Sequence, residues 1–153
     1  MNSQHALLLR YNRPMRKQQS GARSFSSYFS FAPVPCEENL MRLPFSDELT
    51  ANHKETIVHD GAITVILDSV SGFVVRNSCL VAKDISIATL DLRVDRLRPP
   101  LPSMDIYAKG DCYRVSQNIA FVRGWAYDQD IEDPIATSVA TFMLGASKRK
   151  FSD

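Results

Sequence analysis

The sequence predicts an α+β fold in which one long apolar helix packs against an antiparallel β-sheet. Two observations support this prediction. The segment from about residue 58 to about residue 75 is almost entirely apolar and is long enough for about five helical turns. The four strand-like segments that follow it are joined by short connections, which favour antiparallel neighbours. With 153 residues, 44% of them hydrophobic, the chain is long enough for one domain with a substantial core.

Three elements are expected before the main sheet. Residues 24–31 are rich in aromatic side chains and predict a short helix, which Pro33 and Pro35 end. Residues 39–45 predict a strand, and the polar segment 46–54 is typical of a loop. The long helix, from about residue 58 to about residue 75, follows this loop.

The first strand of the main sheet is predicted by strict alternation of apolar and polar residues. Leu90, Leu92 and Val94 are expected to face the core. Thr89 is expected to lie on the opposite face with the charged residues of this strand. The proline-rich turn at 99–102 ends the strand because proline has no N–H group for a sheet hydrogen bond.

Three further strands are predicted at 104–113, 119–127 and 135–144. Gly110 lies on the apolar face of the first of them, where a glycine indicates a bend or bulge. The acidic segment 128–134 joins the last two strands. It lacks the glycine and spacing of a calcium-binding EF-hand loop, so an exposed hairpin turn is the favoured interpretation.

The flanks of the chain differ in charge from its centre. We expect a basic N-terminal extension at 1–24, a folded domain at 25–147 and a polar tail at 148–153. No Asp or Glu occurs before residue 37, and the extension is rich in arginine and serine. Such a segment is typical either of an organelle-targeting peptide, which would make the protein mitochondrial, or of a basic tail on a cytoplasmic protein, which we favour.

Net charge, hydropathy and cysteine content narrow the class of protein. The net charge of +1 gives no reason to expect nucleic acid or an anionic membrane as a partner. No apolar run approaches the roughly 20 residues that span a bilayer. The three cysteines are odd in number and widely spaced, which favours a reducing compartment over a disulfide framework.

One carboxylate, Asp68, lies within the apolar helix. Burying an ionised carboxylate without partners is strongly unfavourable, so such a residue has either partners or a function. Helical spacing puts Asp68 on one narrow stripe of small or polar residues. The other members of the stripe are Gly61, Thr64 and Ser71. The stripe is expected to line a partner helix, a water-filled slot or a ligand.

The start of the helix is a second candidate. The first N–H groups of a helix lack internal acceptors, and the helix dipole adds positive charge there. Gly61 lets a ligand oxygen approach, which suits a developing oxyanion. Gly61 and Asp68 are separated by about 10.5 Å along the helix axis, whereas a catalytic carboxylate must lie about 3 Å from its target. If both act on one carbonyl, the site combines two chains.

Several segments together resemble the hotdog-fold acyl-CoA thioesterases, and most closely their phenylacetate-pathway (PaaI-like) branch. The segments that carry the resemblance are Leu43-Pro44-Phe45, His59-Asp60-Gly61, Asp68, Thr89-Leu90-Asp91-Leu92-Arg93-Val94 and Leu97-Arg98-Pro99. The similarity runs from about Asn39 to Leu144. It implies a hotdog fold, in which a curved antiparallel sheet wraps a long central helix.

The resemblance also implies roles for individual residues. Asp68 would act as the nucleophile or as the general base for water, reaching the substrate from the neighbouring subunit. The N–H of Gly61 would bind the thioester carbonyl, and His59 would help to fix both the helix start and the thioester. Asn52 would hold substrate or water, and Thr89 would assist beside the carboxylate.

The motif departs from the family pattern at two positions. The family has His-Gly-Gly where this chain has Asp60 in the middle. The family spacing for the upstream asparagine falls on His53, one residue after Asn52, so either residue is a candidate for that role.

Three further residues are candidates for binding substrate. Thr64 lies on the polar stripe of the helix. Arg96 and Arg98 lie beside the proline-rich turn, and a guanidinium pairs well with the phosphates of CoA.

The function that the resemblance implies is hydrolysis of an acyl-CoA to a free acid and CoA. No metal or redox cofactor is expected, and the expected assembly is a homodimer or a tetramer of paired dimers. A non-catalytic acyl-CoA-binding or sensing protein on the same fold is the alternative, which the acidic residue and the displaced asparagine favour. A dehydratase of the same fold would use a histidine base in a differently spaced motif, which the sequence lacks.

Overall fold

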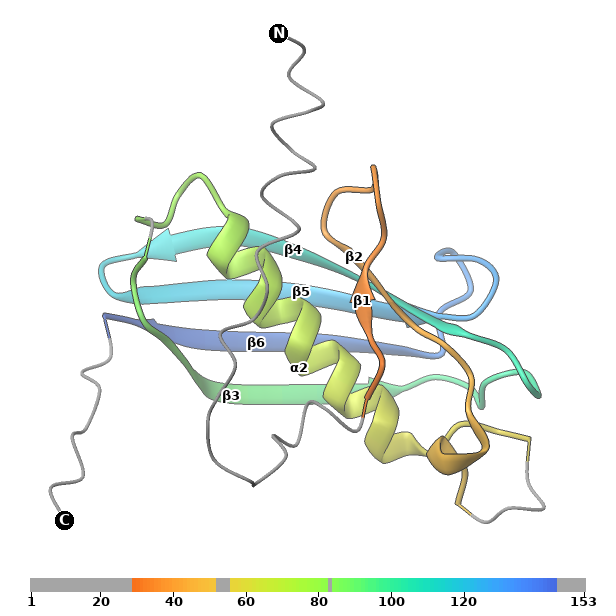
Figure 1. Cartoon of the computed structure of the whole chain (residues 1–153). Helices are drawn as coiled ribbons and strands as arrows, with labels where there is room; N and C mark the ends of the chain where they lie inside the picture. The colour runs from red at the N-terminus through yellow and green to blue at the C-terminus, as the bar shows by residue number, and fades with distance from the viewer. Residues whose placement is uncertain (1–28, 52–55, 83, 146–153) are drawn as a thin grey trace, which may run out of the picture.

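The computed structural model describes residues 29–51, 56–82 and 84–145 (Figure 1). The predicted extension at 1–24, the predicted tail at 148–153 and most of the predicted helix at 24–31 lie outside these residues. The elements in chain order are β1 (Ala32–Pro33), β2 (Leu40–Leu43), η2 (a 3-10 turn, Asp47–Leu49), α2 (Asp60–Asn77), β3 (Ile87–Arg96), β4 (Ile106–Ser116), β5 (Ile119–Tyr127) and β6 (Ala136–Leu144).

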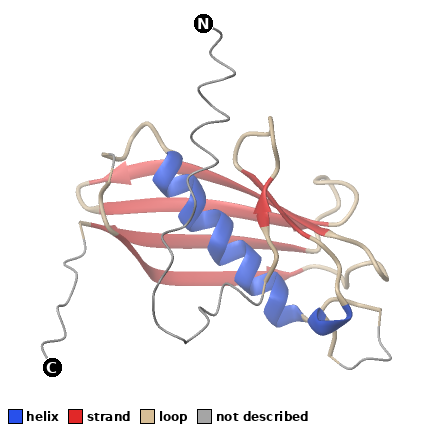
Figure 2. Ribbon diagram, in the orientation of Figure 1, coloured by secondary structure: helices blue, strands red, loops and turns tan. Residues whose placement is uncertain are grey.

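The strands form one antiparallel sheet in the order β1-β2-β4-β5-β6-β3. The helix α2 lies across one face of this sheet (Figure 2). The predicted α+β architecture of one long helix against an antiparallel sheet is therefore confirmed. Because β3 lies at one edge, its second side makes no strand pair with any described residue. Within the described residues, no helix is long and apolar enough to cross a bilayer.

The helix begins and ends two residues later than predicted. Its N-cap is His59, whose backbone is extended and whose side chain accepts a hydrogen bond from the backbone of Gly61. A side-chain acceptor at this position satisfies an N–H that the helix cannot, so the helix begins after His59. Its buried face consists mainly of aliphatic residues, each of which contributes about 1.5–3 kcal/mol on burial. The fully buried aliphatic members are Ile63, Ile66, Leu67, Val70, Val74 and Val75.

The prediction for the inward face of β3 is wrong at one end of the strand. The register of β3 against β6 shifts between Thr89 and Asp91, which marks a β-bulge at Leu90. Leu90 is 52% exposed, whereas Leu92 and Val94 pack against the core as predicted. The bulge absorbs one residue, so Thr89 faces the helix although simple alternation predicts that it faces away.

Gly110 does not form the predicted bend or bulge. It lies within the regular part of β4, opposite Gly124, and the bulge of this strand lies between Cys112 and Arg114. A Cβ atom added to Gly110 would lie 3.0 Å from a methyl carbon of Val74. The glycine therefore permits close packing of α2 on the sheet.

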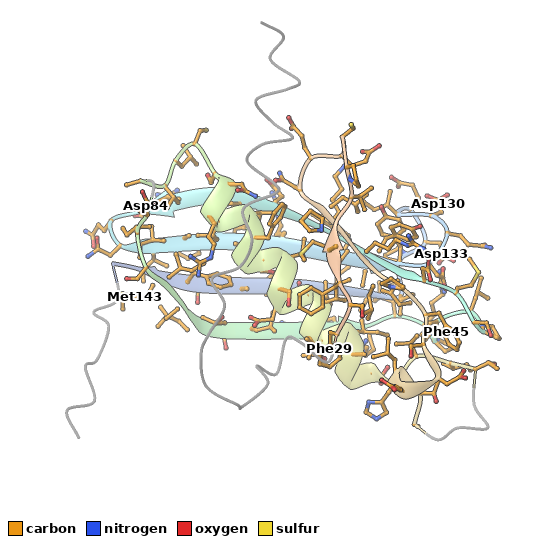
Figure 3. All side chains as sticks on the ribbon, in the orientation of Figure 1. Phe29, Phe45, Asp84, Asp130, Asp133 and Met143 are labelled. Carbon is orange, nitrogen blue, oxygen red and sulfur yellow. The ribbon has the colours of Figure 1, made fainter. Side chains whose placement is uncertain are left out.

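The segments on both sides of β2 pack against the core. Phe29, Phe31 and Phe45 all contact it, and Figure 3 shows where Phe29 and Phe45 lie. Residues 29–31 are not helical, so this end of the predicted helix at 24–31 is wrong.

Candidate functional site

Asp68 lies on α2 at the rim of a groove that runs between the helix and β3. Its carboxylate is half-buried and accepts a hydrogen bond from the hydroxyl of Thr89, with 3.1 Å between the two oxygens. The expectation that this carboxylate is buried inside the helix packing is therefore corrected. The carboxylate has both a partner and access to solvent, which are the two properties that a general base or nucleophile needs.

The bulge in β3 makes this contact possible. In a regular strand, Leu90 would share the inner face with Leu92, and Thr89 would point away from the helix. Because the bulge absorbs Leu90, the hydroxyl of Thr89 reaches Asp68. The structure therefore brings these two predicted residues together by a feature that alternation alone does not reveal.

The groove beside Asp68 has a volume of about 360 Å³. Half of its lining residues are apolar, among them two phenylalanines, and the other half are polar or charged. The lining residues are Asp68, Ser69, Gly72, Phe73, Arg76, Ile87, Thr89 and Phe142. A carboxylate in a groove of mixed polar and apolar lining is suited to a ligand with a reactive polar group and an apolar part.

The polar stripe predicted on the helix is only partly a surface feature. Ser71 is fully buried, and its hydroxyl donates to the carbonyl of Leu67 at 2.7 Å. Ser71 therefore belongs to the core, where its hydroxyl is satisfied within the helix. Thr64 and Asp68 are half-buried, and Gly61 is exposed.

The hydrogen bonds at the start of α2 differ from the sequence prediction, in which the N–H of Gly61 binds the ligand. The N–H of Gly61 donates to Nδ1 of His59, with 2.9 Å between the nitrogens, and the N–H of Ala62 donates to the carbonyl of His59. Among the described residues, the N–H of Asp60 has no acceptor. The available donor in the first turn is therefore one residue before the glycine.

Arg96 reaches the same helix start from the end of β3. Its guanidinium donates to the backbone carbonyl of Asp60 and to the hydroxyl of Thr64. A second nitrogen of the guanidinium lies 3.6 Å from the Asp60 carboxylate. The structure thus brings Arg96 together with Thr64, which is another predicted site residue, and with Asp60.

Arg98 is held in a different environment. It forms a two-pronged ion pair with Asp128, at 2.7 Å and 3.0 Å, and a further ion pair with Asp133. The side chain of Asp128 is fully buried, and it also accepts the N–H of Leu101. The hydrogen bonds from Arg98 are the main reason that the pKa of Asp128 falls to about 2.

This cluster corrects the prediction of an exposed acidic turn. Asp130 and Asp133 are exposed on the connection between β5 and β6 (Figure 3), but Asp128 is buried. The Arg98–Asp128 pair joins that connection to the segment after β3. Sequence reasoning missed this pair because its members lie thirty residues apart and no local pattern links them.

Two predicted site residues, Asn52 and His53, lie outside the described residues. Asp68 and Gly61 lie on one continuous helix, so the axial separation of about 10.5 Å holds within one chain. Among the described residues, no group of three or more His, Cys, Asp or Glu side chains is placed to hold a metal ion.

Comparisons with known proteins give matches among solved structures. Neither a scan of protein-family models nor a search of curated proteins finds a match. A crystal structure of a Pseudomonas aeruginosa protein is 39% identical, covers 68% of this chain and 76% of its own, and has a TM-score of 0.61. A Bacillus halodurans protein crystallised with CoA is 18% identical over 92% of this chain and 83% of its own, with a TM-score of 0.67.

A third match names an activity. A Haemophilus influenzae thioesterase is 14% identical over 84% of this chain and 89% of its own, again with a TM-score of 0.67. At this identity the likeness shows the fold, and several other matches of the same kind are also named thioesterases. The chain therefore has the hotdog fold of these structures, and it is a relative of the Pseudomonas aeruginosa protein.

Proposed function

We propose that this protein hydrolyses an acyl-CoA thioester to a free acid and CoA, at a site that two copies of the chain share. The observation that carries the proposal is the hydrogen bond between Thr89 and Asp68 in a groove lined partly by aromatic and aliphatic side chains. The thioesterases among the structures of the same fold, and the Bacillus halodurans structure with CoA, support the same substrate class.

The chemistry assigned to Asp68 is activation of water. The carboxylate accepts a proton from a water molecule while the oxygen of that water attacks the thioester carbon. The C–S bond then breaks, and the sulfur leaves as the thiol of CoA with the proton returned to it. Direct attack by the carboxylate, followed by hydrolysis of the anhydride, is the other route open to the same residue. In both routes the hydrogen bond from Thr89 fixes the carboxylate of Asp68, which positions the water in the first route and attacks directly in the second.

The oxyanion that forms needs a donor, and we assign this role to the N–H of Asp60 at the helix start. The positive end of the helix dipole supports this role, and no described residue accepts this hydrogen bond. The neighbouring N–H of Gly61 would have to break its hydrogen bond to Nδ1 of His59 before it could bind the oxyanion.

One chain cannot supply both groups. Asp60 and Asp68 are eight residues apart on α2, which corresponds to about 12 Å along the axis. The open edge of β3 is suited to pairing with a second copy. Thr89, near one end of β3, contacts Asp68. Arg96, at the other end of β3, contacts the helix start at Asp60. Antiparallel pairing about the middle of the strand would bring each Asp68 beside the helix start of the partner.

The test is release of free thiol from a panel of acyl-CoAs by the wild type and by Asp68→Ala and Asp68→Asn. We expect both variants to lose about 10²-fold or more in kcat. A matched control is Asp84→Asn, at an exposed aspartate with a φ of 65°, a conformation that asparagine also adopts readily. Undiminished turnover by folded Asp68 variants would refute the assignment.

A non-catalytic acyl-CoA-binding protein is the second candidate. The observation that favours it is the carboxylate of Asp60 in the first turn of α2, where it opposes a developing oxyanion. Binding of acyl-CoA by the wild type without release of thiol from any member of the panel would support this candidate over the enzyme.

A further inference from the structure

Asp60 places a negative charge where the proposed reaction needs a positive one. Its side chain is 67% exposed at the first residue of α2. A carboxylate there stabilises the helix through the dipole, but it also repels an oxyanion bound to the N–H of the same residue. At a separation of about 5 Å and an effective dielectric constant of about 20–40, that repulsion corresponds to roughly a ten- to several-hundred-fold loss of rate.

Arg96 is positioned to cancel this charge. One nitrogen of the guanidinium lies 3.6 Å from the carboxylate of Asp60, and the side chain is only 29% exposed. Partial burial strengthens an electrostatic interaction relative to one in free solution.

The helix itself fixes the guanidinium. Another nitrogen of Arg96 donates to the carbonyl of Asp60 and, at 3.1 Å, to the hydroxyl of Thr64. That hydroxyl in turn donates to the same carbonyl of Asp60 at 3.1 Å. Two of these acceptors do not depend on the carboxylate of Asp60, so the guanidinium keeps its place when only that carboxylate is neutralised.

We propose that Arg96 is a positioning residue that neutralises Asp60 and keeps the start of α2 able to accept negative charge. The inference rests on the proposed function and extends it to the one acidic substitution in the motif. It explains how the chain keeps a carboxylate in the first turn beside the proposed oxyanion donor.

The test is a double-mutant cycle of Arg96→Met, Asp60→Asn and the pair, in which kcat and KM are measured by release of thiol. In the wild-type background we expect Arg96→Met to lower kcat about tenfold or more, with less change in KM. In the Asp60→Asn background we expect the same change to cost less than about threefold. Arg96→Lys should restore part of the loss, because it keeps the charge.

The cycle separates neutralisation from a merely structural role. If Arg96 only tied β3 to the helix, its loss would cost the same in both backgrounds, and that result overturns the inference. Arg123→Met is the matched control, because Arg123 is 53% exposed and faces Asp111 at 3.6 Å on the other face of the sheet. We expect it to leave kcat unchanged.

The inference can fail separately from the proposed function. If the wild type releases no thiol, the enzyme proposal is overturned. The cycle is then measured by calorimetric binding of a hexanoyl-CoA analogue in which a methylene replaces the thioester sulfur and the carbonyl remains. Weaker binding on Arg96→Met in the wild-type background alone supports neutralisation. An equal effect in both backgrounds, or no binding by any variant, overturns it.

Discussion

Two substitutions on the same helix should complement each other if the site is shared. Asp60→Pro removes the N–H that has no acceptor among the described residues, and proline is well tolerated at the first position of a helix. The residue before it, His59, has φ −65° and ψ 142°, which suits a residue that precedes proline. The substitution therefore deletes the donor at little expected cost to folding. Asp68→Asn deletes the carboxylate function.

The expected magnitudes follow from the helix geometry. Loss of one oxyanion donor should lower kcat by about 10²–10³-fold, whereas Asp60→Ala, which keeps the N–H and removes the repelling carboxylate, should not lower it. Because Asp60 and Asp68 lie about 12 Å apart along the axis, each variant alone destroys both sites of a dimer. A mixed dimer keeps one intact site, made of the wild-type Asp68 of one chain and the wild-type residue 60 of the other.

The assay mixes the two variants after dissociation and reassociation and measures release of thiol. Random association makes about half of the dimers mixed, so about a quarter of wild-type activity should return. Native mass spectrometry of differently tagged chains confirms that mixed dimers form. Absence of recovery despite mixed dimers would refute the shared site. Equal activity of Asp60→Pro and Asp60→Ala would refute the role of the N–H group.

Three further predictions concern stability and the groove. Asp128→Asn should destabilise the fold by about 3 kcal/mol at pH 7, because it leaves Arg98 without its buried partner. The lowered pKa of Asp128, about 2, means that its stabilisation is present above the usual carboxyl pKa of about 4 and is lost as pH falls toward 2. Urea unfolding should therefore show the gap between variant and wild type narrowing at low pH, and a constant gap would contradict this. Gly110→Ala should destabilise by about 1–3 kcal/mol, since its Cβ meets Val74 at 3.0 Å, and thermal unfolding would show a lower Tm. Gly72→Ala should stabilise the helix by up to about 1 kcal/mol, because the added Cβ would lie at ordinary contact distances from its neighbours. It should also narrow the groove, so that kcat/KM falls more for bulky acyl groups than for acetyl. An unchanged preference would mean that the acyl group binds elsewhere.

Local patterns predicted the elements that depend on local physics. The strand at 119–127 has its predicted bounds, and the helix is displaced by two residues at each end. The displacement at its start arises because the side chain of His59 accepts from Gly61, a contact that periodicity does not reveal.

The failures arose where a distant segment decides the structure. The bulge at Leu90 depends on the register with β6, and alternation within β3 cannot reveal it. The burial of Asp128 depends on Arg98, which lies in another connection. Asp68 was expected to be buried because the helix is apolar, but only one face of the helix meets the sheet.

Because of the bulge in β3, the strand can lose one residue without changing the face to which its other side chains point. Deletion of Leu90 would give a regular strand in which Thr89 and Leu92 still face the helix. Deletion of Arg93 would instead reverse every side chain on one side of the gap, because the side chains of a strand alternate. Related chains can therefore lose or gain a residue at this one point and keep the hydroxyl beside the carboxylate. An alignment that places the gap at Ile87 instead of Leu90 would align Thr89 with the wrong residue.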